Sequence, residues 1–121
     1  MEKTTIELKL KDGKLYWTTD NGSSWGKVDG TYPIMGVNEK YQIVWETYDD
    51  SIYGIEIHFH NQDICENKSI KGNGTDRVKV KSKDKIPSPC SDSYTIKIIE
   101  TEGGTPKEYD PKIKYPTGST P

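Results

Sequence analysis

The chain of 121 residues contains no alanine, and it has only three leucines, one arginine and one phenylalanine. Alanine and leucine are the leading helix formers, so their scarcity argues against a helical fold. Apolar residues make up 31% of the chain and charged residues 30%, which predicts a thin hydrophobic core. No stretch approaches the roughly 18 consecutive apolar residues that a membrane-spanning helix needs. The amino-terminal segment also lacks the apolar run of a secretory signal, which leaves either a cytoplasmic protein, which is slightly favoured, or a mature chain from which a signal has been removed.

The residue types that are abundant favour β-strands. Thirteen isoleucines, five valines and twelve threonines are β-branched, and eight tyrosines and three tryptophans add aromatic rings. Such side chains suit a pleated sheet. Short alternating runs separated by turn-forming residues predict an antiparallel β-sandwich of seven or eight strands, immunoglobulin-like or cupredoxin-like. The length predicts one domain over residues 1–116, followed by a polar tail over 117–121.

Residues 41–61 carry the strongest strand pattern in the chain. Residues 53–60 alternate between apolar and polar side chains, which places two sets on opposite faces of one strand. Residues 41–48 alternate in the same way, and the acidic stretch Asp49–Ser51 joins the two runs. We predict a central β-hairpin from this pattern. The apolar set of the second run is Ile55, Ile57 and Phe59, and the polar set is Glu56, His58 and His60.

A second motif lies near the amino terminus. Asp12-Gly13 predicts the turn of a first hairpin. Soon after it, Thr18–Trp25 reads T-T-D-N-G-S-S-W and resembles the Asp-box known from sialidases and from other β proteins. Asp20 can accept backbone N–H bonds across this turn, and Gly22 can adopt a positive φ. Sialidases repeat the motif around a propeller, whereas it occurs once here, so we predict a structural turn without a catalytic role.

Two further segments bear on binding. The polar, turn-rich stretch Asn61–Thr75 predicts a long surface loop, and such loops are often functional. The run Arg77–Lys85 then alternates five cations with other residues. These charges indicate either an edge strand protected from pairing with another chain or a face that binds a polyanion. Nucleic acid is the less favoured partner, because the net charge is −2 and four of the five cations are lysines.

The carboxy-terminal segment resembles a known family. A Tyr94–Ile98 strand and the turn at Gly103-Gly104 precede the sequence D-P-K-I-K-Y-P. This arrangement resembles the DP-EP family of small bacterial proteins, and the resemblance implies a compact β-sandwich with no established activity. The matching residues are Asp110, Pro111, Ile113 and Pro116, and Tyr115 stands in the place of the family's glutamate.

A histidine pair is the candidate metal site. His58 and His60 are two residues apart on one predicted strand, so both rings would project from the same face. Two imidazoles in this arrangement can bind Zn²⁺, Cu²⁺ or Ni²⁺, or they can simply belong to a polar outer face. The candidate third ligands are Glu56, Asp63 and Cys65. No histidine follows Cys65 or Cys90, which argues against a blue-copper site, and these two cysteines could be either paired or reduced.

The other candidate binding residues are aromatic or basic, and they are Trp17, Trp25, Tyr53, Arg77, Lys79 and Lys81. Tyrosine and tryptophan combine an apolar body with a polar edge, so they can stack on sugars or line protein interfaces. We therefore predict a non-catalytic binding or structural module for a protein or a glycan, without a cofactor. The alternatives are a metal-binding module and a ribonuclease-like site that uses Glu56, His58 and Arg77.

Overall fold

The computed structural model describes residues 3–30, 34–66, 69–71 and 77–115, with the backbone alone for 69–71. Within these residues the chain forms eleven strands and no helix, and it therefore contains no helix that could cross a membrane. The strands are β1 (Lys3–Lys11), β2 (Lys14–Thr18), β3 (Gly26–Lys27), β4 (Ile34–Gly36), β5 (Gln42–Thr47), β6 (Gly54–Phe59), β7 (Ser69–Lys71), β8 (Arg77–Lys81), β9 (Cys90–Ile99), β10 (Lys107–Tyr109) and β11 (Lys112–Tyr115).

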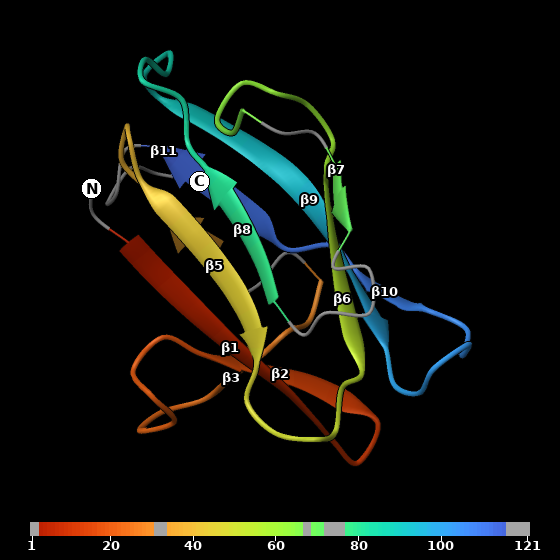
Figure 1. Cartoon of the computed structure of the whole chain (residues 1–121). Helices are drawn as coiled ribbons and strands as arrows, with labels where there is room; N and C mark the ends of the chain where they lie inside the picture. The colour runs from red at the N-terminus through yellow and green to blue at the C-terminus, as the bar shows by residue number, and fades with distance from the viewer. Residues whose placement is uncertain (1–2, 31–33, 67–68, 72–76, 116–121) are drawn as a thin grey trace.

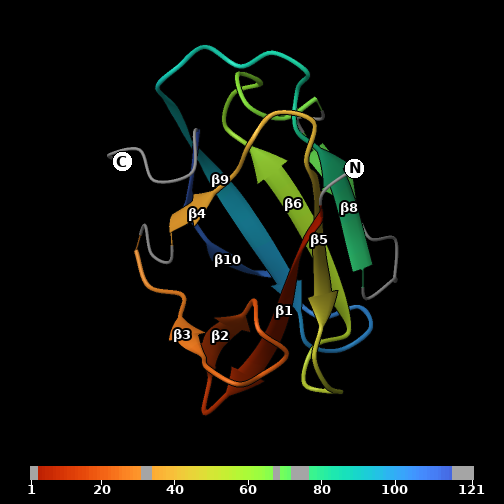
Figure 2. The same ribbon diagram turned by 90° about the vertical axis from the view of Figure 1, so that its left-hand side faces the viewer.

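The strands form two sheets that face each other (Figures 1 and 2). One sheet has the order β3-β2-β1-β5-β8, and the other has the order β4-β11-β9-β6-β7, with β10 also paired to β9. The prediction of an all-β sandwich is confirmed. Two strand pairs, β1 with β5 and β4 with β11, are parallel, so the sheets are mixed where we expected antiparallel pairing throughout. The described strands also outnumber the seven or eight that we expected.

The first hairpin forms where the sequence predicts it. Strands β1 and β2 pair antiparallel, and Lys11 lies opposite Lys14 at the closed end. The two residues between them, Asp12 and Gly13, have φ angles of 53° and 74°. Two consecutive positive φ angles are typical of the tight hairpin turn that matches the twist of its strands.

The predicted central hairpin is wrong. Strands β5 and β6 belong to different sheets, and residues 48–53 carry the chain from one sheet to the other. The faces were nevertheless assigned correctly, because Ile43 and Trp45 from β5 and the apolar set of β6 are buried. Alternation identifies the inward face of each strand. Two inward faces can meet across a sandwich as well as lie side by side in one sheet.

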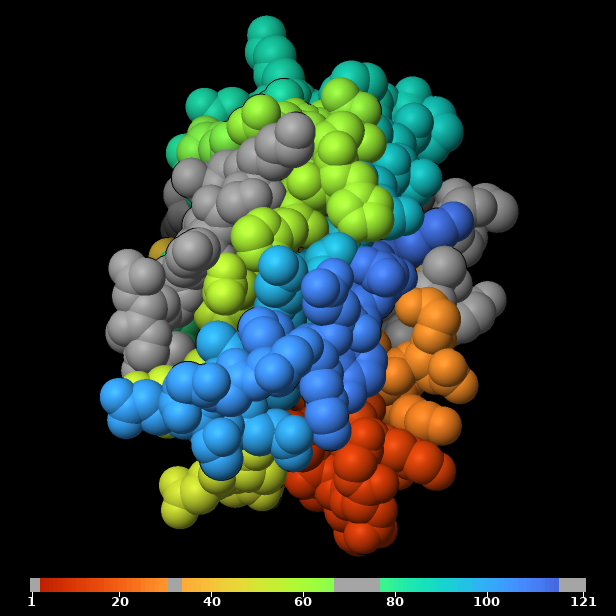
Figure 3. Space-filling model, turned by 90° about the vertical axis from the view of Figure 1, so that its right-hand side faces the viewer, coloured from red at the N-terminus to blue at the C-terminus, as the bar shows by residue number. Residues whose placement is uncertain are grey.

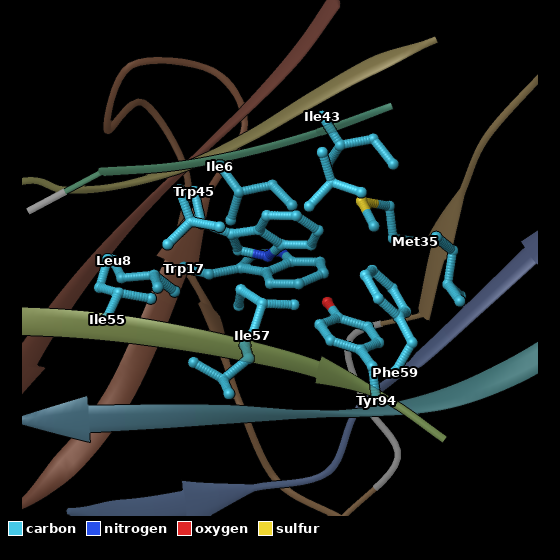
Figure 4. Close-up of a cluster of buried hydrophobic side chains, with 14 of the residues drawn as sticks. Ile6, Leu8, Trp17, Met35, Ile43, Trp45, Ile55, Ile57, Phe59 and Tyr94 are labelled. Carbon is cyan, nitrogen blue, oxygen red and sulfur yellow. The ribbon is translucent and has the colours of Figure 1, made fainter. Parts of the chain in front are cut away.

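The core lies between the sheets and draws side chains from both of them (Figure 4). Trp45 packs against Phe59 and Tyr94, with ring centroids 6.2 Å and 5.6 Å away. These three rings come from β5, β6 and β9, so they join the two sheets. Aromatic pairs at such distances add about 0.5–1.5 kcal/mol each beyond the area that they bury.

The segment after β6 differs in part from the predicted surface loop. Ile64 and Cys65 are fully buried, and β7 pairs with β6 in the six-stranded sheet. Residues 67–68 and 72–75 of that prediction lie outside the described residues, as does the predicted tail over 117–121. Further on, Pro111 separates β10 from β11 and so interrupts the closing strand, as predicted.

Candidate functional site

The Asp-box-like turn is held by a dense set of hydrogen bonds around Asp20. The Thr18 hydroxyl donates to Asp20 Oδ1 at 2.6 Å, and the backbone N–H of Ser24 donates to the same oxygen at 2.9 Å. The Ser24 hydroxyl donates to the other oxygen, Oδ2. Thr18 also accepts the N–H of Gly22 at 3.1 Å. The predicted role of Asp20 as an acceptor across the turn is confirmed, and Gly22 has the expected positive φ, at 87°.

These hydrogen bonds also change the acidity of Asp20. Bonds from the Ser24 and Thr18 hydroxyls and from the Ser24 backbone lower the pKa of its carboxyl group to about 2. Donors to a carboxylate favour its charged form, which is why the pKa falls. The same hydrogen bonds therefore stabilise both the charged form of Asp20 and the turn.

The turn places Trp25 on the outer face of the five-stranded sheet. Its indole ring meets the Tyr48 ring edge to face, with centroids 4.9 Å apart and planes at 86°. Lys9 Nζ, from β1, lies 4.0 Å from the centroid of a Trp25 ring and 5.7 Å from that of Tyr48. We call Lys9, Trp25 and Tyr48 the aromatic corner. Tyr48 is 45% exposed even though it takes part in these contacts, so part of this side chain faces solvent.

A polar hollow of about 590 Å³ lies on the same face of this sheet. Its lining residues are Thr5, Glu7, Thr19, Asp20, Asn21 and Glu46. Glu7 and Glu46 are register partners on the parallel strands β1 and β5. Arg77 on β8 balances part of this negative charge, because its Nε lies 3.5 Å from Glu46 Oε2. The hollow thus combines carboxylate, amide and hydroxyl groups that can hydrogen-bond a polar ligand.

The hollow and the aromatic corner are adjacent. Glu46 and Tyr48 are two residues apart, so they project from the same face of the strand and its continuation. The backbone N–H of Tyr48 continues the ladder by donating to the Leu8 carbonyl at 2.8 Å. Asn21 in the hollow directly precedes Gly22, where an added Cβ atom would lie 3.0 Å from the Tyr48 hydroxyl oxygen. One surface therefore offers an exposed aromatic ring beside a set of polar groups.

Of the other predicted aromatic residues, Trp17 and Tyr53 lie away from this surface. Trp17 is 7% exposed and belongs to the core, where Figure 4 shows it among the buried side chains of both sheets. Tyr53 is 39% exposed, but it lines a separate hollow together with Asp49, Asp50, Glu100 and Glu102. Within the predicted set, only Trp25 belongs to the aromatic corner.

The predicted basic residues lie on β8, at one edge of the five-stranded sheet. Arg77 and Lys79 are exposed and Lys81 is half-buried, while Val78 and Val80 between them face the core. Lys81 lies 3.5 Å from Asp84 and 3.9 Å from Glu66, so its charge is balanced by carboxylates. The strand ends at Lys81, which leaves Lys83 and Lys85 beyond it. This arrangement favours edge protection over a continuous polyanion-binding face.

The two histidines have different partners. His58 Nε2 lies 3.3 Å from Glu56 Oε1. His60 Nε2 lies 3.1 Å from the Thr95 hydroxyl, which donates to Asp110 Oδ1 at 2.6 Å. Among the residues with described side chains, no three histidine, cysteine, aspartate or glutamate groups come together as a metal site would require. The metal-binding prediction therefore gains no third ligand from this geometry.

The ribonuclease-like combination is divided between the two sheets. Glu56 and His58 alternate with buried residues on β6, so they lie on the outer face of the six-stranded sheet. Arg77 lies on the outer face of the five-stranded sheet, beside Glu46. A general base, an acid and a phosphate clamp must all reach one substrate. Groups on opposite outer faces of a sandwich do not meet this requirement.

Both cysteines are free thiols in this structure. Cys65 is fully buried, and burial raises the pKa of its thiol to about 12. Burial also raises the pKa of Cys90, which is less enclosed. Thiolates are the nucleophilic and metal-binding form of cysteine, so neither residue is activated for catalysis.

Tyr48, Lys9 and Glu7 belong to the candidate surface, although they were not among the residues predicted from the sequence. Tyr48 ends the first alternating run and has the outward parity of Glu46, which could have marked it as exposed. Lys9 and Glu7 alternate with the buried residues Ile6 and Leu8 and share the outward parity of β1. The parallel pairing of β1 with β5 brings these residues together, and the sequence contains no signal for that pairing.

No family model matches this chain, and no curated protein sequence matches it. The resemblance to the DP-EP family therefore stays a prediction, which rests on the carboxy-terminal residues.

Proposed function

We propose that this chain is a non-catalytic module that binds a carbohydrate on the outer face of its five-stranded sheet. The observation that carries the proposal is the exposed Tyr48 ring beside the polar hollow. Aromatic rings with a polar edge offer an apolar face for a sugar ring. The hollow supplies the few polar groups that fix the orientation and the identity of a ligand.

The chemistry of the hollow favours a neutral sugar. Three carboxylates, from Glu7, Asp20 and Glu46, line it and can accept hydrogen bonds from sugar hydroxyls. The same carboxylates repel uronic and sialic acids. Asp20 and Glu46 already have partners in Thr18, Ser24 and Arg77, so we expect Glu7 and Asn21 to make most of the direct contacts.

The site is also preorganised. The Asp20 hydrogen bonds hold the turn that forms one wall of the hollow, and Trp25 supports the edge of the Tyr48 ring. A ligand that meets a rigid surface avoids the cost of ordering side chains, about 0.5–1.5 kcal/mol for each flexible group. This rigidity supports a recognition role for a turn that also stabilises the fold.

A glycan array probed with the labelled protein tests the proposal, followed by calorimetry on each sugar that binds. We expect neutral oligosaccharides to bind and Tyr48→Ala to weaken binding about tenfold, which corresponds to about 1.4 kcal/mol. The matched control is Tyr53→Ala, which removes another exposed tyrosine from a different hollow and should leave affinity unchanged. An array without bound sugars, or equal binding by the wild type and Tyr48→Ala, would contradict the proposal.

We also propose that the fold is related to immunoglobulin-like or cupredoxin-like proteins and that the protein is bacterial. The two-sheet architecture supports such a relation, and the DP-EP resemblance supports the origin.

A further inference from the structure

A groove of about 520 Å³ lies at the open side of the sandwich, on the side away from the contacts of β8 with β6 and β7. The first sheet contributes Gly13–Leu15 and Lys27–Gly30, and the second contributes Glu108–Asp110. We call these residues the open groove. In Figure 3 the blue atoms of the β10 region lie directly above the red atoms of the first hairpin, and residues from both regions line the groove.

Two strand edges border the open groove. β3 stands at the end of the five-stranded sheet and pairs with β2. β10 pairs with β9 through Lys107, Glu108 and Tyr109, and no second partner strand for β10 occurs within the described residues. The outer edge of such a strand presents unpaired backbone N–H and C=O groups. These groups recognise extended polypeptide backbone, which adds to the sheet as a further strand.

The inner wall of the open groove reaches the hydrophobic core. Leu15 and Val28 are buried core residues, and Tyr109 is half-buried and packs against the same core. Tyr109 lies opposite Ile96 in the register of β10 and β9, so its ring shares the inward face of the sheet. Alternate side chains of an added strand would point toward these apolar groups, which therefore favour small apolar residues at those positions.

The rim of the open groove carries charges of both signs, from two lysines and three carboxylates, and Lys97 lies opposite Glu108 in the register of β9 and β10. Lys14 on β2 and Glu108 on β10 have no ion-pair partner among the described side chains. Lys27 lies 3.8 Å from Asp29, and Asp110 Oδ1 accepts the Thr95 hydroxyl and lies 3.9 Å from His60 Nε2. A segment with one acidic and one basic side chain complements Lys14 and Glu108, which a neutral sugar does not.

From the edges, the apolar wall and the rim charges, we propose that the open groove binds an extended polypeptide segment of a partner protein. The segment pairs with the free edge of β10, turns small apolar side chains toward Leu15 and Val28, and places a basic side chain near Glu108 and an acidic one near Lys14. This site is separate from the aromatic corner and does not depend on the proposed sugar site.

Two fluorescein-labelled peptides, TVEVTVKVT and TVKVTVEVT, test both strand directions against the full chain. We expect one of them to bind with a measurable anisotropy change, and a version with proline at two alternate positions, TVEPTPKVT or TVKPTPEVT, not to bind. Hydrogen exchange of the unmodified protein should slow at the β10 amides when the peptide is added. Failure of both peptides to bind at millimolar concentration, or protection confined to β8, overturns the proposal.

A charge-reversal variant provides a second test. We expect Glu108→Lys to lower the affinity for the bound peptide at least fivefold. A peptide with glutamate in place of its lysine should restore the affinity of this variant. The matched control is Glu102→Lys, which makes the same change of charge at an exposed residue outside the groove and should leave affinity unchanged. Equal affinities for the two variants overturn the proposal. Concentration-dependent protection of β10 without peptide also overturns it, because a second copy of the chain would then be the occupant.

Discussion

The Tyr48 ring lies against Gly22, and it occupies space that a side chain at position 22 would need. A Cβ atom on Gly22 would lie 3.0 Å from the Tyr48 hydroxyl oxygen and 3.3 Å from the nearest ring carbons. Gly22 also has a φ of 87°, which residues with a Cβ atom rarely adopt. The glycine of the Asp-box-like turn therefore serves both the local backbone and the placement of the Tyr48 ring.

Gly22→Ala should lower the free energy of unfolding by about 1–2 kcal/mol, the cost of a left-handed conformation for a residue with a Cβ atom. It should also weaken sugar binding, because Tyr48 must move. Urea denaturation and calorimetry measure the two effects. In a Tyr48→Ala background, Gly22→Ala should still lower the free energy of unfolding through the backbone, but the added Cβ atom no longer meets the Tyr48 ring. Unchanged stability in both backgrounds would show that the turn adapts without strain.

Asp20 should make the stability of the turn depend on pH in the acidic range. Its folded pKa of about 2 lies below the ordinary value of 3.8. The folded state therefore binds the proton less readily than the unfolded state, and stability contributed by Asp20 is lost as pH falls from about 4 to about 2. A carboxyl NMR titration should place the Asp20 midpoint near pH 2, and Asp20→Asn should remove this part of the pH dependence. A midpoint near 4 would contradict the hydrogen-bond pattern.

Tyr94→Phe should leave the protein as stable as the wild type or stabilise it by about 1 kcal/mol. The Tyr94 side chain is fully buried, and its hydroxyl oxygen makes no hydrogen bond of good geometry within the described residues, although the Trp45 indole N–H is its neighbouring donor. The substitution keeps the ring contacts with Trp45 and Phe59 and removes a buried polar group. Tyr94→Ala, which removes the ring as well, should cost about 3–5 kcal/mol. Denaturant midpoints compare the two, and a large loss for the phenylalanine variant would indicate a hydrogen bond to the hydroxyl.

The two thiols should differ in reactivity. Cys65 is fully buried with a pKa of about 12, whereas Cys90 is half-buried. A thiol reagent at pH 8 should modify Cys90 in the native protein and Cys65 only after unfolding, since both access and thiolate are needed. Cys90→Ser should abolish the native reaction and Cys65→Ser should preserve it. Rapid labelling of Cys65 would instead reveal local opening of the segment after β6.

The sequence was sufficient to identify strands and their inward faces, because a period of two is a property of each strand alone. It was not sufficient to assign strands to sheets. The alternation of residues 41–48 and 53–60 is the same whether the strands pair or face each other, and the path of residues 48–53 between β5 and β6 decides the outcome. The parallel pairing of β1 with β5 likewise depends on the path of the whole chain.

Burial outside the regular pattern was equally hard to predict. Val44 has the outward parity of its strand, yet it is fully buried, with Thr5 and Lys79 as its neighbours on the adjoining strands. Ile64 is buried in a stretch that is otherwise polar and rich in turn-forming residues. For the candidate site, the Asp-box-like turn was readable because its hydrogen bonds are local. The Tyr48 ring joins it only through tertiary packing.

The parallel ladder between β1 and β5 also constrains the order in which the chain can assemble. β1 can pair with β2 as soon as the first hairpin has been synthesised, because that contact is local. Its other edge stays open until β5 has emerged, so the nascent hairpin presents an unpaired strand for that interval. The charged residues Glu7 and Lys9 alternate with the apolar residues along this edge. Charged side chains at such positions oppose the association of an unpaired strand with neighbouring chains.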